Sequence, residues 1–423
     1  MALIKRPRLL HNIAALASVQ ATSYLIPLIT LPYLTRTLGV EAWGEIALAQ
    51  AIIGYFSIVT SWGFSWSATR KIAAARDNGP QLARVFAATW SAQWVLTTMM
   101  TLILLALVVF VPFFQKNKFL YLWGICSIIS GILFPAWFFN GLERMKEVAI
   151  FQVAMRVVAL PFIFLLISNS NDAPMIIAIN AVSGLLGGVA SLCWIKKNFN
   201  FCWSLPKRNE IWAELKEGGA IFTSTVWIGL YTTLTPSILG MLAGPVAVGY
   251  YTLADRARQA AQSTLAPASQ ALFPRLSHLF KNDPLEAHRL LDRSGRIIVT
   301  ASALLSIFLW LAADMIVHFL GGVEFKQGGA ILRWLAPLPL LVGISNIFGI
   351  QVMLPNYKTK AFNRILGLAG ALSLSIIGPL IHWKGAEGAA INTLITECFV
   401  SLAMGGYLMK QGFFSATERG FKK

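Results

Sequence analysis

The stretch 246–274, VAVGYYTLADRARQAAQSTLAPASQALFP, is long and mostly apolar, yet it carries Asp255, Arg256 and Arg258 near its middle. A charge at the centre of a spanning helix costs about 2.5–3.5 kcal/mol even on insertion-based scales, so such residues persist where they line a water-filled path or pair with a neighbour. The three charges therefore indicate the functional region, provided that this stretch crosses a membrane.

The composition indicates a membrane protein. Of the 423 residues, 56% are hydrophobic and 13% are charged, with a mean hydropathy of +0.64, whereas a typical soluble domain is about 25% charged. A spanning helix requires about 20 mostly apolar residues, and the chain contains about twelve such runs. They lie near 10–34, 43–66, 84–112, 118–141, 148–168, 174–195, 218–242, 246–274, 297–320, 329–354, 361–382 and 386–409. We therefore predict an all-α integral membrane protein with about twelve transmembrane helices.

The basic residues predict the topology. Most of the 35 Lys and Arg residues fall in alternate predicted loops, and Lys and Arg accumulate on the cytoplasmic side of short loops. An even number of spans with both termini in the cytoplasm follows. The same bias, together with attraction to anionic lipid head groups, accounts for most of the net charge of +17. No nucleic-acid partner is expected, because the chain has no basic soluble domain of sufficient length.

Two regions repeat each other at a constant offset of 205 residues. The offset relates Leu38-Gly39, Gly44, Leu48-Ala49 and Arg70 to Ala243-Gly244, Gly249, Leu253-Ala254 and Arg275. We predict an N-terminal six-helix bundle at 1–200, a cytoplasmic linker at 201–217 and a C-terminal six-helix bundle at 218–423. Transporters built from two halves of the same orientation bind substrate between the halves.

Polar residues form a stripe along the eighth predicted span. Residues three and four positions apart share one face of a helix, and Asp255, Arg258, Gln259 and Gln262 are spaced in this way. Such a stripe does not face lipid, because its polar groups would lack partners there. Two interpretations follow: a seam between helices in which Asp255 neutralises Arg258, or the wall of a cavity. Two arginines against one aspartate favour an anionic ligand.

Other spans carry isolated polar groups. Arg156 is a second mid-span cation, and Glu397, near the middle of the last span, is either a coupling group for protons or cations or the partner of an arginine. Gln20 and Tyr24 share one face of the first span and are candidates to line a path. Asp314 and His318, one helical turn apart near a span end, are expected to form an interfacial pair.

Motifs for enzyme chemistry are missing from the sequence. It contains no phosphate-binding Gly-rich loop followed by Lys-Ser/Thr, no Ser-His-Asp set and no metal-ligand spacing in a polar segment. We therefore expect no enzyme activity, no cofactor and no metal site.

Several motifs resemble a known family. PLITLPYLTRTLG at 27–39, followed by Trp43-Gly44, is similar to the start of Wzx-type O-antigen and polysaccharide flippases, in the multidrug/oligosaccharidyl-lipid/polysaccharide superfamily that also contains multidrug and toxin extrusion exporters. GYYTLADR at 249–256 and LFPRLS at 272–277 look like the eighth-helix pattern of that family. The resemblance covers nearly the whole chain.

The resemblance implies two six-helix bundles around a central cavity, and a bacterial inner-membrane protein that moves an undecaprenyl-diphosphate-linked oligosaccharide to the outer leaflet. Membrane lipids are further partners, and a polysaccharide polymerase and a chain-length regulator are candidate protein partners. Arginine provides fixed, bidentate donors for phosphate. The substrate-binding cations expected on this basis are Arg156, Arg256 and Arg258, with Arg36 at the outer mouth.

Two other functions compete with this one. A cation-coupled multidrug exporter on the same scaffold favours acidic cavities, whereas the few acids within these spans are matched by arginine. A membrane-embedded glycosyltransferase or ligase usually carries a large loop domain or clustered acids, and the predicted outer loops are short.

Overall fold

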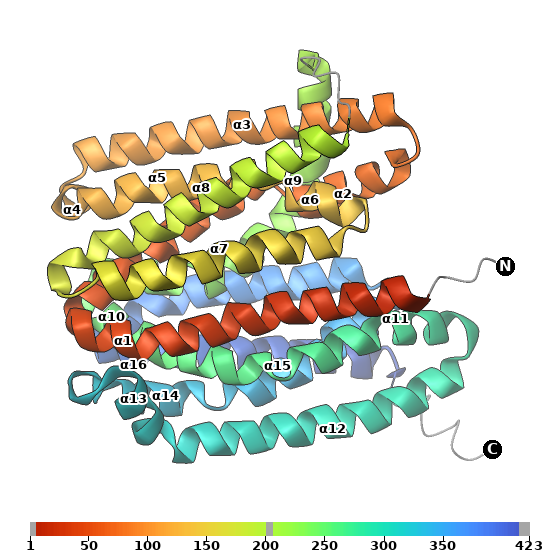
Figure 1. Cartoon of the computed structure of the whole chain (residues 1–423). Helices are drawn as coiled ribbons and strands as arrows, with labels where there is room; N and C mark the ends of the chain where they lie inside the picture. Colours follow the sequence, from red (N-terminus) through yellow and green to blue (C-terminus); the bar gives the residue numbers. More distant parts are fainter. Residues whose placement is uncertain (1–5, 200–205, 414–423) are drawn as a thin grey trace. The chain divides into compact units, whose positions relative to one another are not determined.

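The computed structural model describes residues 6–199 and 206–413, and this part of the chain is almost entirely helical, without a strand (Figure 1). Within the described residues, nine segments are long and apolar enough to cross a membrane. The predicted twelve spans are consistent with these nine, because α1 and α16 are each interrupted and the described set lacks most side chains of the first predicted span and part of those of the seventh. The protein is a multi-pass, all-α membrane protein.

The chain divides into two compact units, residues 1–229 and 230–423. The first contains α1 (Arg6–Ser61), α2 (Phe64–Ala75), α3 (Gly79–Phe110), α4 (Pro112–Lys116), α5 (Lys118–Leu133), α6 (Ala136–Gly141), α7 (Met145–Leu166), η1 (Ser170–Asp172), α8 (Ala173–Asn198) and most of α9 (Arg208–Thr232). Residues 208–217 of the predicted linker are thus the start of a helix, and 201–205 lie outside the described residues. The division into six-helix bundles stays a prediction.

The second unit contains the remaining helices. These are α10 (Thr235–Ser263), α11 (Ala266–Asn282), α12 (Pro284–Leu311), α13 (Ala313–Gly321), η2 (Val323–Phe325), α14 (Gly328–Leu335), α15 (Leu338–Asn346), the π-helix η3 (Ile347–Met353) and α16 (Thr359–Lys410). Within this unit, α10 packs against α16 and α14, and α12 packs against α15.

A glycine with positive φ breaks the helix in each of α1, α10 and α16. Gly39 in α1 has φ 76° and ψ 176°, Gly244 in α10 has φ 81° and ψ 174°, and Gly385 in α16 has φ 54° and ψ −125°. Backbone of this kind is essentially restricted to glycine, because a Cβ atom would clash with the chain. Gly39 and Gly244 are matched by the 205-residue repeat, and they share nearly the same dihedral angles.

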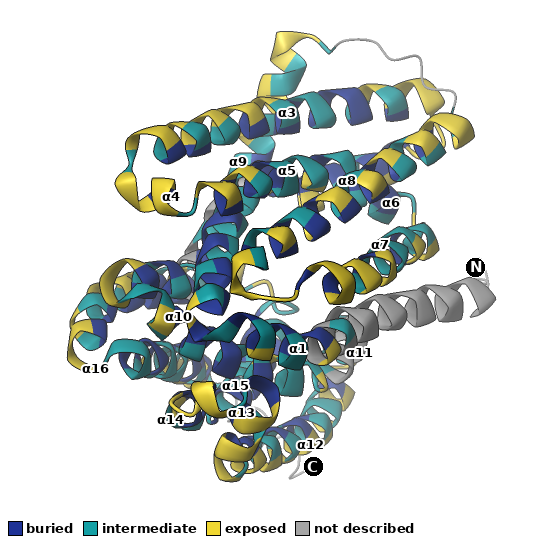
Figure 2. Cartoon of the chain, turned by 60° about the vertical axis from the view of Figure 1, so that its left-hand side comes forward, coloured by how far each residue is buried: buried dark blue, intermediate teal, exposed yellow. Residues whose placement is uncertain are grey.

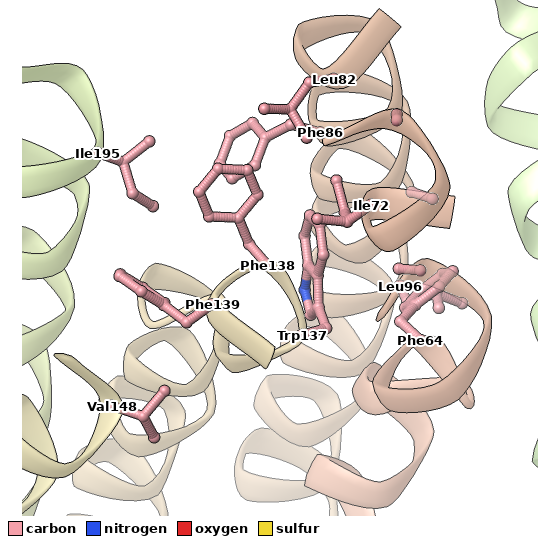
Figure 3. Packing of buried hydrophobic residues seen from close by; sticks show 13 residues of the cluster. Phe64, Ile72, Leu82, Phe86, Leu96, Trp137, Phe138, Phe139, Val148 and Ile195 are labelled. Carbon is pink, nitrogen blue, oxygen red and sulfur yellow. The ribbon is translucent and has the colours of Figure 1, made fainter. Parts of the chain in front are cut away.

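An aromatic core holds the first unit together near the start of α3 (Figure 3). Phe86 of α3 packs against Trp137 and Phe138 of α6, with ring centroids 5.5 and 5.1 Å apart. The Trp137 indole donates to Gln93 Oε1 at 3.0 Å, which satisfies both polar groups in this apolar setting. The short helix α6 is therefore fixed between α2 and α3.

Exposed residues follow many of the helices (Figure 2), and large apolar side chains are abundant among them. On α12, Ile297 and Leu311 are each 70% exposed, and Leu402 of α16 is 75% exposed. Exposed apolar surface on this scale is unfavourable in water but is what a helix presents to lipid, so these faces mark the expected contact with the bilayer.

Candidate functional site

The polar stripe on α10 forms one hydrogen-bonded network. Arg258 Nε donates to Asp255 Oδ1 at 2.8 Å, and its Nη2 lies 2.7 Å from the same oxygen. Gln259 Nε2 donates to the second carboxylate oxygen, Asp255 Oδ2, at 2.7 Å. On the other side, Arg258 Nη1 donates to Gln262 Oε1. The stripe predicted from 3- and 4-residue spacing is therefore present, and its four members are mutually connected.

The ion pair at the centre of the network is largely withdrawn from the surface of the second unit, whereas Gln259 is exposed. The Arg258 and Asp255 side chains are 12% and 17% exposed. A buried ion pair contributes little net stability, because desolvation offsets much of the attraction, whereas removing one partner leaves a costly unpaired charge. Asp255 therefore holds Arg258 in one rotamer, and Arg258 remains a fixed cation inside an apolar helix.

Helix α16 supplies a second layer to this network. Tyr251 lies one turn before Asp255 on α10, and its hydroxyl shares a 3.2 Å hydrogen bond with Thr393 Oγ1. Glu397 lies one turn after Thr393, and its carboxylate interacts electrostatically with Arg258. The described residues include no ion pair of Glu397, so Glu397 is a neighbour of the Arg258 charge without a direct salt bridge.

Sequence reasoning missed Tyr251 and Thr393. Each lies four residues before a predicted site residue, Asp255 and Glu397 respectively, so each shares that residue's helix face. The pair joins α10 to α16 by a hydrogen bond one turn from the predicted site residues. In the sequence, each of the two is a polar residue one helical turn from a predicted site residue. Only the packing of α10 against α16 shows that the two side chains meet.

The remaining predicted cations occupy different places. Arg256 is half-buried and interacts electrostatically with Asp255, but a one-residue step turns its side chain by about 100° from that face. Arg156 is half-buried on α7 of the first unit, and Arg36 is exposed on α1, three residues before the break at Gly39. The structure therefore brings Asp255, Arg258, Gln259, Gln262 and Glu397 together in one unit, with Arg256 beside them.

Two predicted residues cannot be compared with the structure. The backbone at Gln20 and Tyr24 belongs to α1, but their side chains lie outside the described residues. Across the described residues, no group of three or more His, Cys, Asp or Glu side chains is placed to hold a metal ion.

Comparison with known proteins identifies the family. Residues 9–280 match the polysaccharide biosynthesis protein family. The chain belongs to this family. A relative in Escherichia coli (strain K12), named "Putative O-antigen transporter", is 32% identical over 93% of this chain and 95% of its own length. A second relative, in Haloferax volcanii, is named "Probable low-salt glycan biosynthesis flippase"; it is 22% identical over 87% of this chain and 78% of its own length.

Solved structures share the fold of this family member at low sequence identity. The lipid II flippase MurJ in an inward closed conformation has a TM-score of 0.75 and 14% identity, over 97% of this chain and 91% of its own. An inward-facing multidrug resistance transporter of the MATE family has a TM-score of 0.74 and 13% identity, over 96% and 99%. These findings confirm the predicted resemblance and fold class, and the relatives are named as transporters and a flippase rather than as enzymes.

Proposed function

We propose that this protein is a flippase that moves an undecaprenyl-diphosphate-linked oligosaccharide, the repeat unit of O-antigen or a related surface polysaccharide, across the bacterial inner membrane. Family membership and the names of the relatives support the substrate class. The observation that carries the proposal for the site is the buried Arg258 within the Asp255–Gln259–Gln262 network of α10.

A diphosphate-linked head group needs a cation to leave water. Charge-assisted hydrogen bonds from a guanidinium to phosphate are short and frequently bidentate, and arginine stays charged in an apolar setting. In the proposed cycle, Arg258 is held by Asp255 before substrate arrives and turns donors toward the diphosphate when it enters. Asp255 then retains Gln259 as a partner, so the carboxylate is not left without a hydrogen bond.

The rest of the proposed site extends beyond this network. Arg156, Arg256 and Arg36 are proposed as further cations along the path, and Gln20 and Tyr24 as polar groups lining it. The proposed mechanism is alternating access between the two bundles around a central cavity, while the lipid tail stays in the bilayer. Both termini are proposed to lie in the cytoplasm, and a polysaccharide polymerase and a chain-length regulator are proposed partners. Glu397 is proposed to couple translocation to a proton or cation, because its carboxylate interacts with Arg258.

The test is complementation of a strain that lacks the gene, with surface polysaccharide and lipid-linked intermediates both measured. Wild type should restore surface polymer, Arg258→Ala should leave single repeat units on their lipid carrier on the cytoplasmic side, and Arg258→Lys should restore part of the polymer, because charge is retained without bidentate geometry. Arg364→Ala is the matched control, since Arg364 is an exposed arginine in the same unit.

Three outcomes would contradict parts of the proposal. Full activity of Arg258→Ala would remove Arg258 from the site. A wild-type translocation rate and pH dependence in Glu397→Gln would make Glu397 structural. Normal surface polymer in the deletion strain, together with altered drug tolerance, would favour the multidrug exporter.

A further inference from the structure

A cavity whose lining includes no residue of the Arg258 network lies in the C-terminal unit. It has a volume of about 540 Å³ and is bounded by α12 on one side and by α15 and η3 on the other, with Phe413 at one end. None of its lining residues belongs to α10 or α16. The volume falls within the range of about 300–1,000 Å³ that is typical of ligand pockets.

The cavity is elongated along α12. Its lining residues on that helix include His288, Asp292, Arg296 and Thr300, which follow one another at four-residue steps. At about 1.5 Å per residue, the first and last of them are about 18 Å apart along the axis. A volume of 540 Å³ spread over this length is a slender channel, shaped for a single extended chain rather than for a bulky sugar group.

The two walls of the channel differ in chemistry. The wall opposite the α12 residues is apolar and contains Ile344, Ile347, Phe348 and Val352. Phe348 and Val352 belong to the hydrophobic core of this unit, so this wall has firm support. At the start of α12, the His288 ring packs 4.7 Å from Phe413 and 5.8 Å from Phe280, centroid to centroid, and these rings close the channel at that end.

Cationic groups surround the same part of α12. Arg296 makes a two-point ion pair with Asp292, with Nε–Oδ1 at 3.1 Å and Nη2–Oδ2 at 2.7 Å. This pair uses two of the five guanidinium donors, and the Arg296 side chain is 79% exposed. Arg289 and Arg293 on the same helix are also exposed. A chain that lies in the channel therefore has the exposed donors of Arg296 beside it as an anion-binding group.

We infer that this channel binds one acyl chain of an anionic membrane phospholipid, with the lipid phosphate held by the outward donors of Arg296. The apolar wall and slender shape fit the chain, and the basic residues of α12 complement the phosphate. An undecaprenyl chain is several times longer than an acyl chain, so this channel would hold only a fraction of it. The inference does not depend on the proposed flippase function.

A larger side chain in place of Gly295 would fill the channel. Gly295 is buried, lines the cavity, and a Cβ atom added to it would meet only Ile347 Cδ1, at 3.9 Å, an ordinary van der Waals distance. Gly295→Leu should therefore fold and occupy the space of the lipid chain. Ile297→Phe is the matched control, because it adds bulk to the same helix at a residue that is 70% exposed.

The experiment is native mass spectrometry of the purified, delipidated protein titrated with phosphatidylglycerol, phosphatidylethanolamine or a polyprenyl monophosphate. Wild type and Ile297→Phe should each retain one tightly bound phosphatidylglycerol. In Gly295→Leu the affinity of this site should fall at least about tenfold, which the displacement of two methylene groups suffices to produce. Arg296→Gln should reduce the preference for phosphatidylglycerol over phosphatidylethanolamine while retaining the chain.

Equal phosphatidylglycerol retention in wild type and Gly295→Leu would overturn the inference. Preferential retention of the polyprenyl phosphate at the Gly295-sensitive site would assign the channel to a polyprenyl lipid instead. If Gly295→Leu does not purify as a folded protein, Gly295→Ala, which adds a single methyl group, provides the same comparison with a smaller expected loss.

Discussion

The helix segments that follow Gly39 and Gly244 share a backbone but differ in charge. Both glycines adopt nearly the same left-handed conformation, and the Leu-Ala pairs at 48–49 and 253–254 are buried in their respective units. Beyond that point the two repeats diverge. The 205-residue offset places Gln50, Ala51 and Ile53 where the second repeat has Asp255, Arg256 and Arg258. The break and the small apolar surface are thus requirements of the scaffold, whereas the charges belong to one repeat only and point to function.

The largest effect is expected when the charges of the second repeat are removed, so that it becomes neutral like the first. Arg258→Gln alone leaves Asp255 without its cation, and loss of one partner of a buried pair costs about 3–5 kcal/mol, with partial exposure reducing that figure here. Adding Asp255→Asn should recover most of the stability, because no buried charge remains. Both variants should lose translocation.

Thermal unfolding of the purified proteins measures the loss and recovery of stability, and the complementation assay measures translocation. A double variant that restores surface polymer would show that the charges only neutralise each other in a seam between helices, which is the structural interpretation of the stripe.

A smaller effect on stability is expected at the two glycines that the repeats share. Gly39→Ala and Gly244→Ala should each lower the free energy of unfolding by about 1–3 kcal/mol, the usual cost of a non-glycine residue in a sparsely populated backbone region. A Cβ atom at Gly244 meets nothing within 4 Å, so the cost there arises from the backbone alone. Gly406→Ala is the control, since it also has open space around its Cβ position and lies in a regular part of α16.

Thermal unfolding in one detergent compares the three variants. Similar losses at Gly39 and Gly244, with none at Gly406, would support equivalent breaks in the two repeats. A loss at only one of the two sites would show that the repeat is retained in sequence without a common structural demand.

Local patterns predicted the elements of the site well. Residues at 3- and 4-residue steps share a helix face whatever the tertiary structure, so the stripe from Asp255 to Gln262 followed from spacing alone. The 205-residue repeat likewise matched Gly39 to Gly244, and the two glycines have nearly the same dihedral angles. Hydropathy and length together indicated the all-α membrane fold, because only helices or closed barrels satisfy the backbone within lipid.

Partners that are distant in the sequence were not predictable in the same way. Asp314 was expected to pair with His318 one turn away, but its carboxylate binds Arg333 of α14 instead. The contact of Tyr251 with Thr393 spans 142 residues. Both depend on how one helix is rotated against another, and a single sequence leaves this rotation undetermined by about a third of a turn.

The later parts of the two repeats offer a last contrast. Arg70 and Arg275 are matched by the offset, but Arg70 Nη2 lies 2.6 Å from Oε1 of Glu217, a residue of α9. Lys71 Nζ adds contacts of 2.7 Å to Glu217 and 2.8 Å to Glu214. For Arg275 the structure records no ion pair with any described residue. Only the first repeat is therefore joined to α9 by charge.

Acid should weaken the ion pairs that join Arg70 and Lys71 to α9. Hydrogen bonds from Lys71 and then from Arg70 hold the pKa of Glu217 below its usual value of 4.5. A carboxylate with a depressed pKa contributes stability that is fully present above its unfolded pKa and is lost as the pH falls through the folded value. The protection factors of the amides over 208–217, which are corrected for the intrinsic exchange rate at each pH, should thus be unchanged from pH 7 to about 5 and decrease below about 4.5.

The effect should be the smallest of those predicted, because Glu217 is about one-third exposed and solvent screens its ion pairs. In Glu217→Gln, the protection factors over 208–217 at pH 7 should already be lower than in wild type and should decrease less on acidification. Glu387→Gln serves as the control, since Glu387 lies on α16 of the other unit and accepts its hydrogen bond from Trp334 rather than from a cation. If acid loosens wild type and Glu217→Gln equally, apolar contacts such as the stacked Trp62 and Phe222 rings, with centroids 4.1 Å apart, hold α9 in place instead.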